Sequence, residues 1–504
     1  MIIPLREHRL AAALGVSAVA LGSFAALHYF LLDLTLSHYD ARGHLVVARR
    51  IFDSLTPGWR QIGAVWLPLP HLLNAIPVQV DAFYRNGASA VVISILSFAV
   101  ATMSVGYIVR RLTGSVLGAV SAAAVFALNP NVLYLQSTPM TEPLLLGLLL
   151  PATAMLVDWC AAPAATTEAG ALVTAGERRA RAIGILFSLA CLTRYEAWPA
   201  TAAAMAIAAF VFWRRGVAWR SIVHAFLPMA LWPAGAIVGF MAFSRVVIGE
   251  WFVSSGFFVP DNPAQGSSLA VVRSLVWGLD ALSGHGLVAL AGIGLVALLA
   301  VGLRRSAHAP VLVALSLLAT AALPFAAFYS GHPFRIRYMV PLIAAQAVGV
   351  GMAVGLRPRL RPLAFIASLV VIALELRPLE ATAPMILEAQ WDRPSSLERQ
   401  AVTECLREKW DGRPILVSMG SLGHYMQELS HEGFAIHDFI HEGNTALWDM
   451  GLQQAGAVTE LVVVSERPDG RDALVGPARE TPAFLEGFVR VCEGGQVALY
   501  QRTR

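Results

Sequence analysis

Charged residues are scarce in this chain. Only 14% of its 504 residues are Asp, Glu, Lys or Arg, and Lys409 is the only lysine. Soluble globular proteins carry about 25% charged residues, whereas 57% of this chain is hydrophobic and its mean hydropathy is +0.62. This composition excludes an ordinary soluble protein and predicts an integral membrane protein.

Other features are missing as well. The net charge is only +4, and the arginines sit in short clusters between apolar runs, which favours control of membrane topology over nucleic-acid binding. A GxGxxG motif is absent, so nothing indicates a dinucleotide site. No His/Cys spacing identifies a metal site, and a divalent metal ion stays open as a cofactor without assigned ligands.

Cysteine is rare too. Cys160 and Cys191 fall in apolar runs, while Cys405 and Cys492 lie in the polar C-terminal part of the chain. The last two form one disulfide if that part faces an oxidising compartment. Two free thiols are the alternative.

Long apolar runs are abundant and predict a polytopic α-helical protein with about 11 transmembrane helices. The first run is longer than the apolar core of a signal peptide, so we interpret it as an uncleaved span. The predicted spans are 11–32, 88–109, 113–129, 142–159, 181–193, 197–213, 221–243, 286–303, 309–328, 338–356 and 362–375.

Arginine clusters set the predicted orientation. Clusters such as Arg110–Arg111 and Arg304–Arg305 all fall on one side of the predicted spans, and the positive-inside rule makes that side cytoplasmic. The N-terminus is then cytoplasmic, and an odd number of spans places residues 376–504 outside. We expect a bacterial inner membrane, with long outer segments at 33–87, 244–285 and 376–504.

The first outer segment carries an acid just beyond the first span. Its YDARGHLVVARRIFDSL stretch has apolar residues at helical spacing and predicts an amphipathic helix at the membrane interface. Asp40 and His44 are four residues apart and share a face of this helix. Three prolines and Trp66 follow, which predicts a second surface-lying or re-entrant element.

The chain resembles the GT-C superfamily of membrane glycosyltransferases, in the branch of protein O-mannosyltransferases and aminoarabinose transferases. The resemblance covers residues 1–375 and is carried by the motifs HYDARGHLVVARRIFDS with WLPLPHLL, STPMTEPLLL, LTRYEAWP and FRIRYMVPL. It implies a GT-C-like catalytic module that takes a sugar from a polyprenyl-phosphate carrier on the outer leaflet.

Two acids are the catalytic candidates. Glycosyl transfer needs a carboxylate that accepts or orients the acceptor proton, and the resemblance places the catalytic acid at Asp40. Helix N-capping is the structural alternative for Asp40. Glu142 opens the fourth predicted span from the outer side. It either faces Asp40 in a cavity, orienting the acceptor or holding a metal, or simply favours the helix start.

Cationic candidates lie at two further places on the outer face. Arg194, Tyr195 and Glu196 interrupt an apolar run, either as a turn with an internal ion pair or as contacts to the acceptor or donor phosphate. The FYSGHPFRIRYMVPL stretch is the strongest cationic element on that face. Guanidinium matches phosphate in a bidentate manner, and the resemblance places the Arg-Tyr pair near the lipid phosphate. The residues concerned are His332, Arg335, Arg337 and Tyr338, and binding of lipid headgroups is the alternative.

The remaining outer segments are less specific. Segment 244–285 predicts a lid or a plain loop. Residues 376–504 are more polar and show short strands and a β-hairpin with Gly494-Gly495 at its turn. Helical patterns near 396–409, 421–430 and 445–455 alternate with the strands. They predict an extracytoplasmic α/β domain for acceptor binding or structural support.

The sequence thus predicts an inverting glycosyltransferase with Asp40 as base. Its partners are a polyprenyl-phosphate-linked sugar, membrane lipid and a glycan, lipid or protein acceptor, and no nucleic acid. The rival functions are a transporter or flippase and a non-catalytic envelope assembly protein. A transporter should show paired repeats and charges near the midplane, and no clear repeat is visible.

Overall fold

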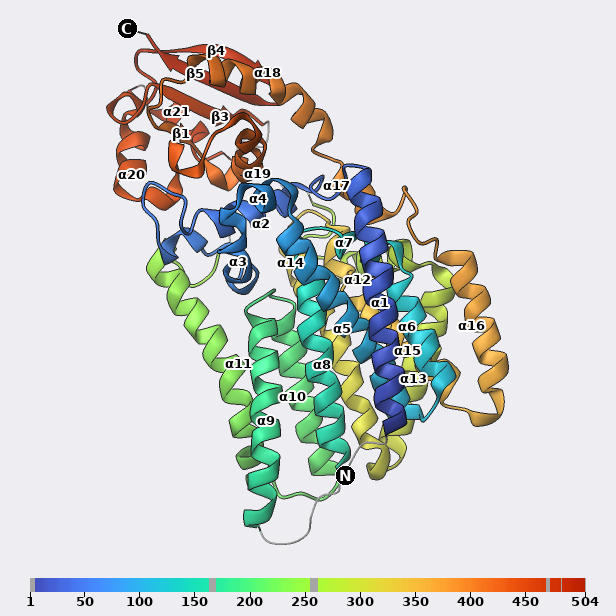
Figure 1. The fold of residues 1–504 in the computed structure, drawn as a ribbon. Coiled ribbons are helices and arrows are strands. Elements are labelled where there is room, and N and C mark those ends of the chain that lie inside the picture. The colour runs from blue at the N-terminus through green and yellow to red at the C-terminus, as the bar shows by residue number, and fades with distance from the viewer. Residues whose placement is uncertain (1–4, 163–168, 254–261, 468–471, 482, 504) are drawn as a thin grey trace.

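The computed structural model describes residues 5–162, 169–253, 262–467, 472–481 and 483–503. Figure 1 shows a bundle of long helices with a smaller C-terminal region at one end, and helix α1 starts at the opposite end of the bundle. The chain segment that carries Asp40 lies between these two parts (Figure 1). The molecule is therefore built so that a short outer segment is enclosed between a membrane bundle and a cap.

Within the described residues, eight helical segments are long and apolar enough to cross a membrane, and each matches one predicted span. In the segment Ile336–Gly355, 89% of the most apolar stretch of 18 residues is buried, and this segment forms the centre of the bundle. In Arg9–Leu31 only 22% of the corresponding stretch is buried, as expected for a helix that faces lipid. The other six are Ala88–Thr113, Glu142–Ala161, Ala197–Arg214, Trp219–Ile248, His285–Arg304 and Ser306–Tyr329.

Three further predicted spans coincide with helices that are either too short or too polar to be counted among these eight segments. Helix α6 has 12 residues, α16 has 15, and charged residues between Glu177 and Arg181 interrupt α9. The helices of the bundle are α1 Leu5–Leu31, α5 Ala88–Thr113, α6 Val116–Ala127, α7 Pro130–Leu135, α8 Glu142–Ala161, α9 Ala169–Cys191, α10 Ala197–Arg214, α11 Trp219–Ile248, α12 Ser268–Ser283, α13 His285–Arg304, η3 Ser306–Ala321, α14 Ala322–Tyr329, η4 Ile336–Met339, α15 Leu342–Gly355, η5 Pro358–Leu360 and α16 Arg361–Glu375.

Helix α12 is a difference from the sequence prediction, because it occupies part of the predicted outer segment 244–285. The Trp277 ring lies 5.4 Å from Phe334, and a side chain at Gly278 would collide with Met339. Helix α12 therefore packs directly against the FRIRYM stretch and supports it. Residues 254–261 of the segment predicted to be a lid or a plain loop lie outside the described residues.

The outer segment 33–87 folds into α2 Tyr39–Arg49, η1 Trp59–Ile62, α3 Leu69–Asn74, η2 Pro77–Gln79 and α4 Asp81–Asn86. Helix α2 is buried continuously from Asp40 to Ala48 rather than along one face. Trp66 lies so close to Gly43 that any side chain there would collide with its ring. The proline-rich element thus packs over α2.

The C-terminal region holds a five-stranded mixed sheet in the order β2-β1-β3-β5-β4. Strands β1, β2 and β3 are parallel, and the β4–β5 hairpin adds to β3 antiparallel. The hairpin was predicted, but its turn uses Gly495 and Gln496, both at positive φ, one residue later than expected. The strands are β1 Ile415–Val417, β2 Phe439–Ile440, β3 Leu461–Ser465, β4 Phe488–Gly494 and β5 Val497–Arg502.

The C-terminal part of the chain also holds helices. The three predicted ones are present, and the short α17 and α21 were not predicted. They are α17 Pro384–Ala389, α18 Arg393–Lys409, α19 Met419–Leu429, α20 Ala446–Gln453 and α21 Val475–Glu480, with short 3-10 turns at η6 Ser430–Glu432, η7 Ile436–Asp438, η8 Glu442–Asn444 and η9 Ala455–Ala457.

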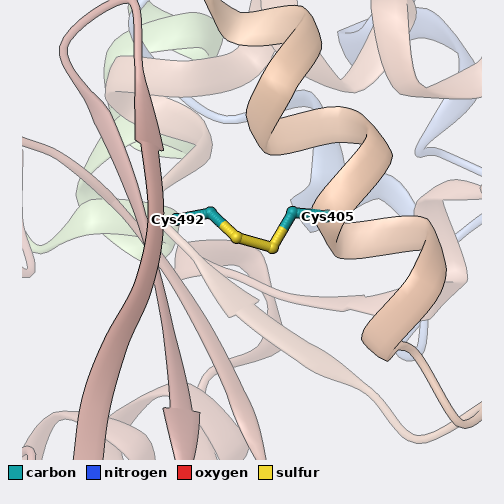
Figure 2. The surroundings of a disulfide bond; sticks show 2 residues. All are labelled: Cys405 and Cys492. Carbon is teal, nitrogen blue, oxygen red and sulfur yellow. A yellow bond between two sulfur atoms is a disulfide. The ribbon is translucent and has the colours of Figure 1, made fainter.

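A disulfide joins α18 to the edge strand β4. Figure 2 shows Cys405 on the helix bonded to Cys492 on the strand, so the disulfide is the alternative that the structure adopts. The two remaining cysteines, Cys160 and Cys191, are free and buried in the bundle. Disulfides persist in oxidising compartments.

This pairing predicts a thiol count. Denatured protein that has not been reduced should react with maleimide at Cys160 and Cys191 only, and reduction should expose the other two cysteines. Replacing both Cys405 and Cys492 by serine should cost the C-terminal region about 2–5 kcal/mol of stability, because a cross-link restricts the unfolded chain. Mass spectrometry and thermal unfolding measure these effects, and four reactive thiols without reduction would contradict the pairing.

Candidate active site

Asp40 lies in the first turn of α2 and is 7% exposed. The helix N-cap is His38, whose Nδ1 accepts a hydrogen bond from the backbone N–H of Asp40 at 3.1 Å. The capping role that could have explained an acid at this position is therefore filled by another residue. The Asp40 carboxylate is left to make a contact of its own.

That contact is an ion pair with Arg337, from the start of the central helical segment. Glu388 is a second acid beside this guanidinium, with 3.9 Å between its Oε1 and Arg337 Nε. Glu388 also lies 3.6 Å from His38 Nε2 and accepts the backbone N–H of Ile336 at 3.2 Å. Two acids thus share one buried arginine.

Glu388 was not predicted as a site residue. It comes from α17, beyond the last predicted span, in the region that we assigned to a separate domain. Its signal in the sequence is an isolated acid in the apolar run APMILEAQW. Such an acid is costly to bury unless it is paired, and here it is 2% exposed.

The charge of Asp40 is stabilised by its neighbours. Burial alone would raise the pKa of the Asp40 carboxyl, but the positive charge of Arg337, with smaller contributions from His38 and His44, lowers this pKa below its ordinary value. Asp40 is therefore ionised at neutral pH despite its burial. It can accept a hydrogen bond or a proton, and its basicity depends on how close Arg337 stays.

A second cluster is built around Arg194, in the turn between α9 and α10. Its guanidinium pairs with Glu142 at 2.9 Å and with Glu196 at 2.6 Å, and it donates to Thr141 Oγ1 at 3.0 Å. The two carboxylates outweigh the effect of burial and raise the pKa of Arg194. The local Arg194–Glu196 pair matches the structural alternative, but the contact with Glu142 also joins two helices.

The two clusters are neighbours, because the charges of Arg194 and Arg337 act on one another. His44 lies within reach of the charges of Asp40, Arg194 and Arg337. Its Nδ1 is 3.0 Å from His71 Nε2. Burial, and then the neighbouring His71, lower the pKa of His44 well below its ordinary value. Both rings are neutral at physiological pH, since burial also lowers the pKa of His71 to about 3.

The other predicted residues surround this centre at different distances. Arg335 packs over Trp391, 5.2 Å from the ring centre, rather than pairing with Asp40. Arg337 lies 5.5 Å over the Tyr338 ring, and the Tyr338 hydroxyl is 3.5 Å from His332 Nε2. The Tyr195 hydroxyl donates to the backbone carbonyl of Ala64 at 3.5 Å. The outer segment therefore closes over the Arg194 cluster as well.

A small apolar hollow lies beside Glu142. It is large enough to hold about one water molecule. Phe98, Phe126, Leu146 and Val340 contribute to its wall. In the described part of the chain, no group of three or more His, Cys, Asp or Glu side chains is arranged to hold a metal ion.

This arrangement resembles solved membrane enzymes in its fold. Two crystal structures of ArnT from Cupriavidus metallidurans, one bound to undecaprenyl phosphate and one in the apo state, match 96% of this chain at 14% identity with a TM-score of 0.60. The matches cover 97% and 98% of the ArnT chains. An Archaeoglobus fulgidus oligosaccharyltransferase structure matches 89% of this chain and 67% of its own, at 12% identity and a TM-score of 0.46.

No protein-family model and no curated protein sequence matches the chain significantly. The likeness in structure extends through the bundle and the C-terminal region together, since it covers nearly the whole of both chains. This chain therefore has the fold of the ArnT structures, which agrees with the resemblance predicted from its sequence.

Proposed function

We propose that this protein is a glycosyltransferase that moves a sugar from a polyprenyl-phosphate carrier to an acceptor at the outer face of the membrane. The observation that carries the proposal is the buried Asp40–Arg337 pair, which holds a base and a phosphate-binding group side by side. The ArnT fold supports it, because one ArnT structure contains undecaprenyl phosphate.

The reaction divides between these two residues. The acceptor hydroxyl attacks the anomeric carbon, the bond from that carbon to the carrier phosphate breaks, and the phosphate leaves with the electron pair. Asp40 takes the proton of the hydroxyl, and Arg337 stabilises the charge that develops on the leaving phosphate. A single displacement of this kind inverts the anomeric configuration.

Arg337 serves both partners in turn. Without donor, its guanidinium neutralises Asp40. A phosphate carries more charge than a carboxylate and matches the guanidinium fork, so a bound donor draws Arg337 away from Asp40. The carboxylate then loses its main stabilising charge while it remains buried. Its pKa rises as a result, which makes it a stronger base. Glu388 stays beside Arg337 and limits how far it can move.

The Arg194 cluster is the proposed acceptor side of the site. Glu142 and Glu196 hold Arg194 in place, and their remaining lone pairs can accept hydrogen bonds from sugar or acceptor hydroxyls. Tyr195, His44 and His332 are the proposed cavity residues. Glu388 follows the domain boundary predicted at residue 375, so the proposed site also includes a residue from the C-terminal part of the chain.

Orientation is part of the proposal. Arginine clusters favour a cytoplasmic N-terminus, and the Cys405–Cys492 disulfide favours an oxidising compartment for the C-terminal region. In a bacterium this places the site at the periplasmic face of the inner membrane. The polyprenyl chain of the donor can then stay in the bilayer while its phosphate reaches Arg337.

The proposed function first predicts how Arg337 affects binding of the carrier phosphate. Arg337→Ala in nanodiscs should weaken binding of undecaprenyl phosphate about 10–100-fold, since hydrogen bonds between charged groups contribute about 1.5–3 kcal/mol. Arg337→Lys should recover part of the loss, because one ammonium replaces a bidentate fork. The matched control is Arg377→Ala, an exposed arginine just after α16. Equal losses in both alanine variants would remove Arg337 from the donor site.

The second prediction separates the proposed roles. Asp40→Asn should abolish release of carrier phosphate from polyprenyl-phosphate sugars in the presence of an envelope extract. It should also bind undecaprenyl phosphate about 3–10-fold more tightly than wild type, because a competing anion on Arg337 is gone. Binding isotherms and product analysis measure both effects.

The control for this prediction is Asp33→Asn, an exposed acid in the same outer segment. It should leave both binding and turnover unchanged. Weaker binding by Asp40→Asn, or normal turnover, would show that Asp40 neither competes for Arg337 nor acts as the base.

A further inference from the structure

Helix α2 is also held from the side opposite Asp40. Arg42 follows Asp40 by two residues, which is about 200° around a helix, so the two side chains point in nearly opposite directions. Asp40 contacts the membrane bundle through Arg337. Arg42, only 6% exposed, contacts the C-terminal region instead.

The contact is a buried ionic network. Arg42 pairs with Asp392 at 2.9 Å and also with Glu428 of α19. Arg399 of α18 bridges the same two acids, at 2.7 Å from Asp392 and 2.8 Å from Glu428. The Ser396 hydroxyl donates to Glu428 at 3.0 Å. Among the described residues of this network, Arg42 alone comes from the first outer segment, 33–87, and the others belong to the C-terminal region.

The surrounding contacts reinforce the same link. Helix α19 packs along α2, and the rings of Tyr39 and His424 meet edge to face with 6.1 Å between centres. Figure 1 shows α19 directly over α2 and α4. Asp392 comes four residues after Glu388, which touches Arg337. The short stretch 388–392 therefore contacts both Arg337 of the bundle, through Glu388, and Arg42 of α2, through Asp392.

We propose that the C-terminal region positions the catalytic carboxylate, with Arg42, Asp392 and Glu428 as positioning residues that fix the N-terminal end of α2. The inference rests on the proposed function and deepens it. It assigns the C-terminal region a role in holding Asp40 against Arg337, in place of the acceptor-binding role that the sequence left open.

The pairing within the network makes this testable without unfolding the region. If Arg42 loses its charge, Arg399 still pairs with both Asp392 and Glu428. The two acids therefore keep a cation from the C-terminal region. What is lost is the ionic attachment of α2 through Arg42. Beyond the C-terminal end of α2, a separate attachment remains, since Asp53 accepts the backbone N–H of His437 at 3.1 Å.

The test uses the full chain in nanodiscs. Hydrogen exchange of peptides covering residues 39–49 reports whether α2 is anchored. Donor turnover, followed as carrier phosphate released from a polyprenyl-phosphate sugar with an envelope extract, gives kcat and KM. The variants are Arg42→Gln, Glu428→Gln and Arg42→Lys. The matched control is Arg407→Gln, which removes an exposed pair with Glu432, also 2.9 Å long, within the C-terminal region.

Arg42→Gln should raise hydrogen exchange in α2 by about tenfold and lower kcat about 10–100-fold, the penalty expected for a small misplacement of a catalytic group. The KM for donor and the Kd for undecaprenyl phosphate should not rise, since Arg337 itself is untouched and a displaced Asp40 competes less with the phosphate. Glu428→Gln should act in the same direction, Arg42→Lys should recover part of kcat, and Arg407→Gln should do neither.

Three results would overturn the inference: unchanged exchange in α2, loosened α2 with normal kcat, or equal effects of Arg407→Gln. Failure of the proposed function has a different signature. Wild type would then release no carrier phosphate, while the exchange measurement would still report whether Arg42 anchors α2.

Discussion

A carboxylate and a guanidinium removed from water are stable only when they face one another, because each pays a desolvation cost of several kcal/mol. Asp40 and Arg337 are such a pair. They come from distant parts of the sequence and meet where the first outer segment lies between the bundle and the C-terminal region. The enclosure of α2 keeps this pair away from water, and Glu388 adds a second acid beside Arg337.

The two residues of this pair are supported in different ways. Arg337 begins the most deeply buried membrane segment, and helix α12 supports its stretch of chain from the side. Asp40 sits on a helix of only 11 residues, too short to be rigid by itself. Packing of Trp66, the proline-rich element and the C-terminal region over this helix supplies the rigidity that its length cannot. A mobile acid and a fixed cation would make a poor catalytic centre.

Much of this arrangement could be predicted from the sequence, and the rest fails for identifiable reasons. Apolar runs identified the eight long spans because burial in lipid requires about 20 apolar residues in series. The cations at 335 and 337 were identifiable because positive charge on the predicted outer face opposes the topological bias. Helix α12 was not predicted because Arg273 and Asp280 interrupt its apolar pattern. The role of Glu388 was not predicted because pairing between distant segments leaves no local sequence pattern. The pairing of Asp40 with Arg337, rather than separate sites for each, needed the fold.

The most direct test is a structure of the protein with undecaprenyl phosphate bound. We expect the Arg337 guanidinium to contact the phosphate and to have separated from Asp40, with α2 still anchored through Arg42. A phosphate held elsewhere, with Arg337 still paired to Asp40, would contradict the claim that donor and base share this arginine.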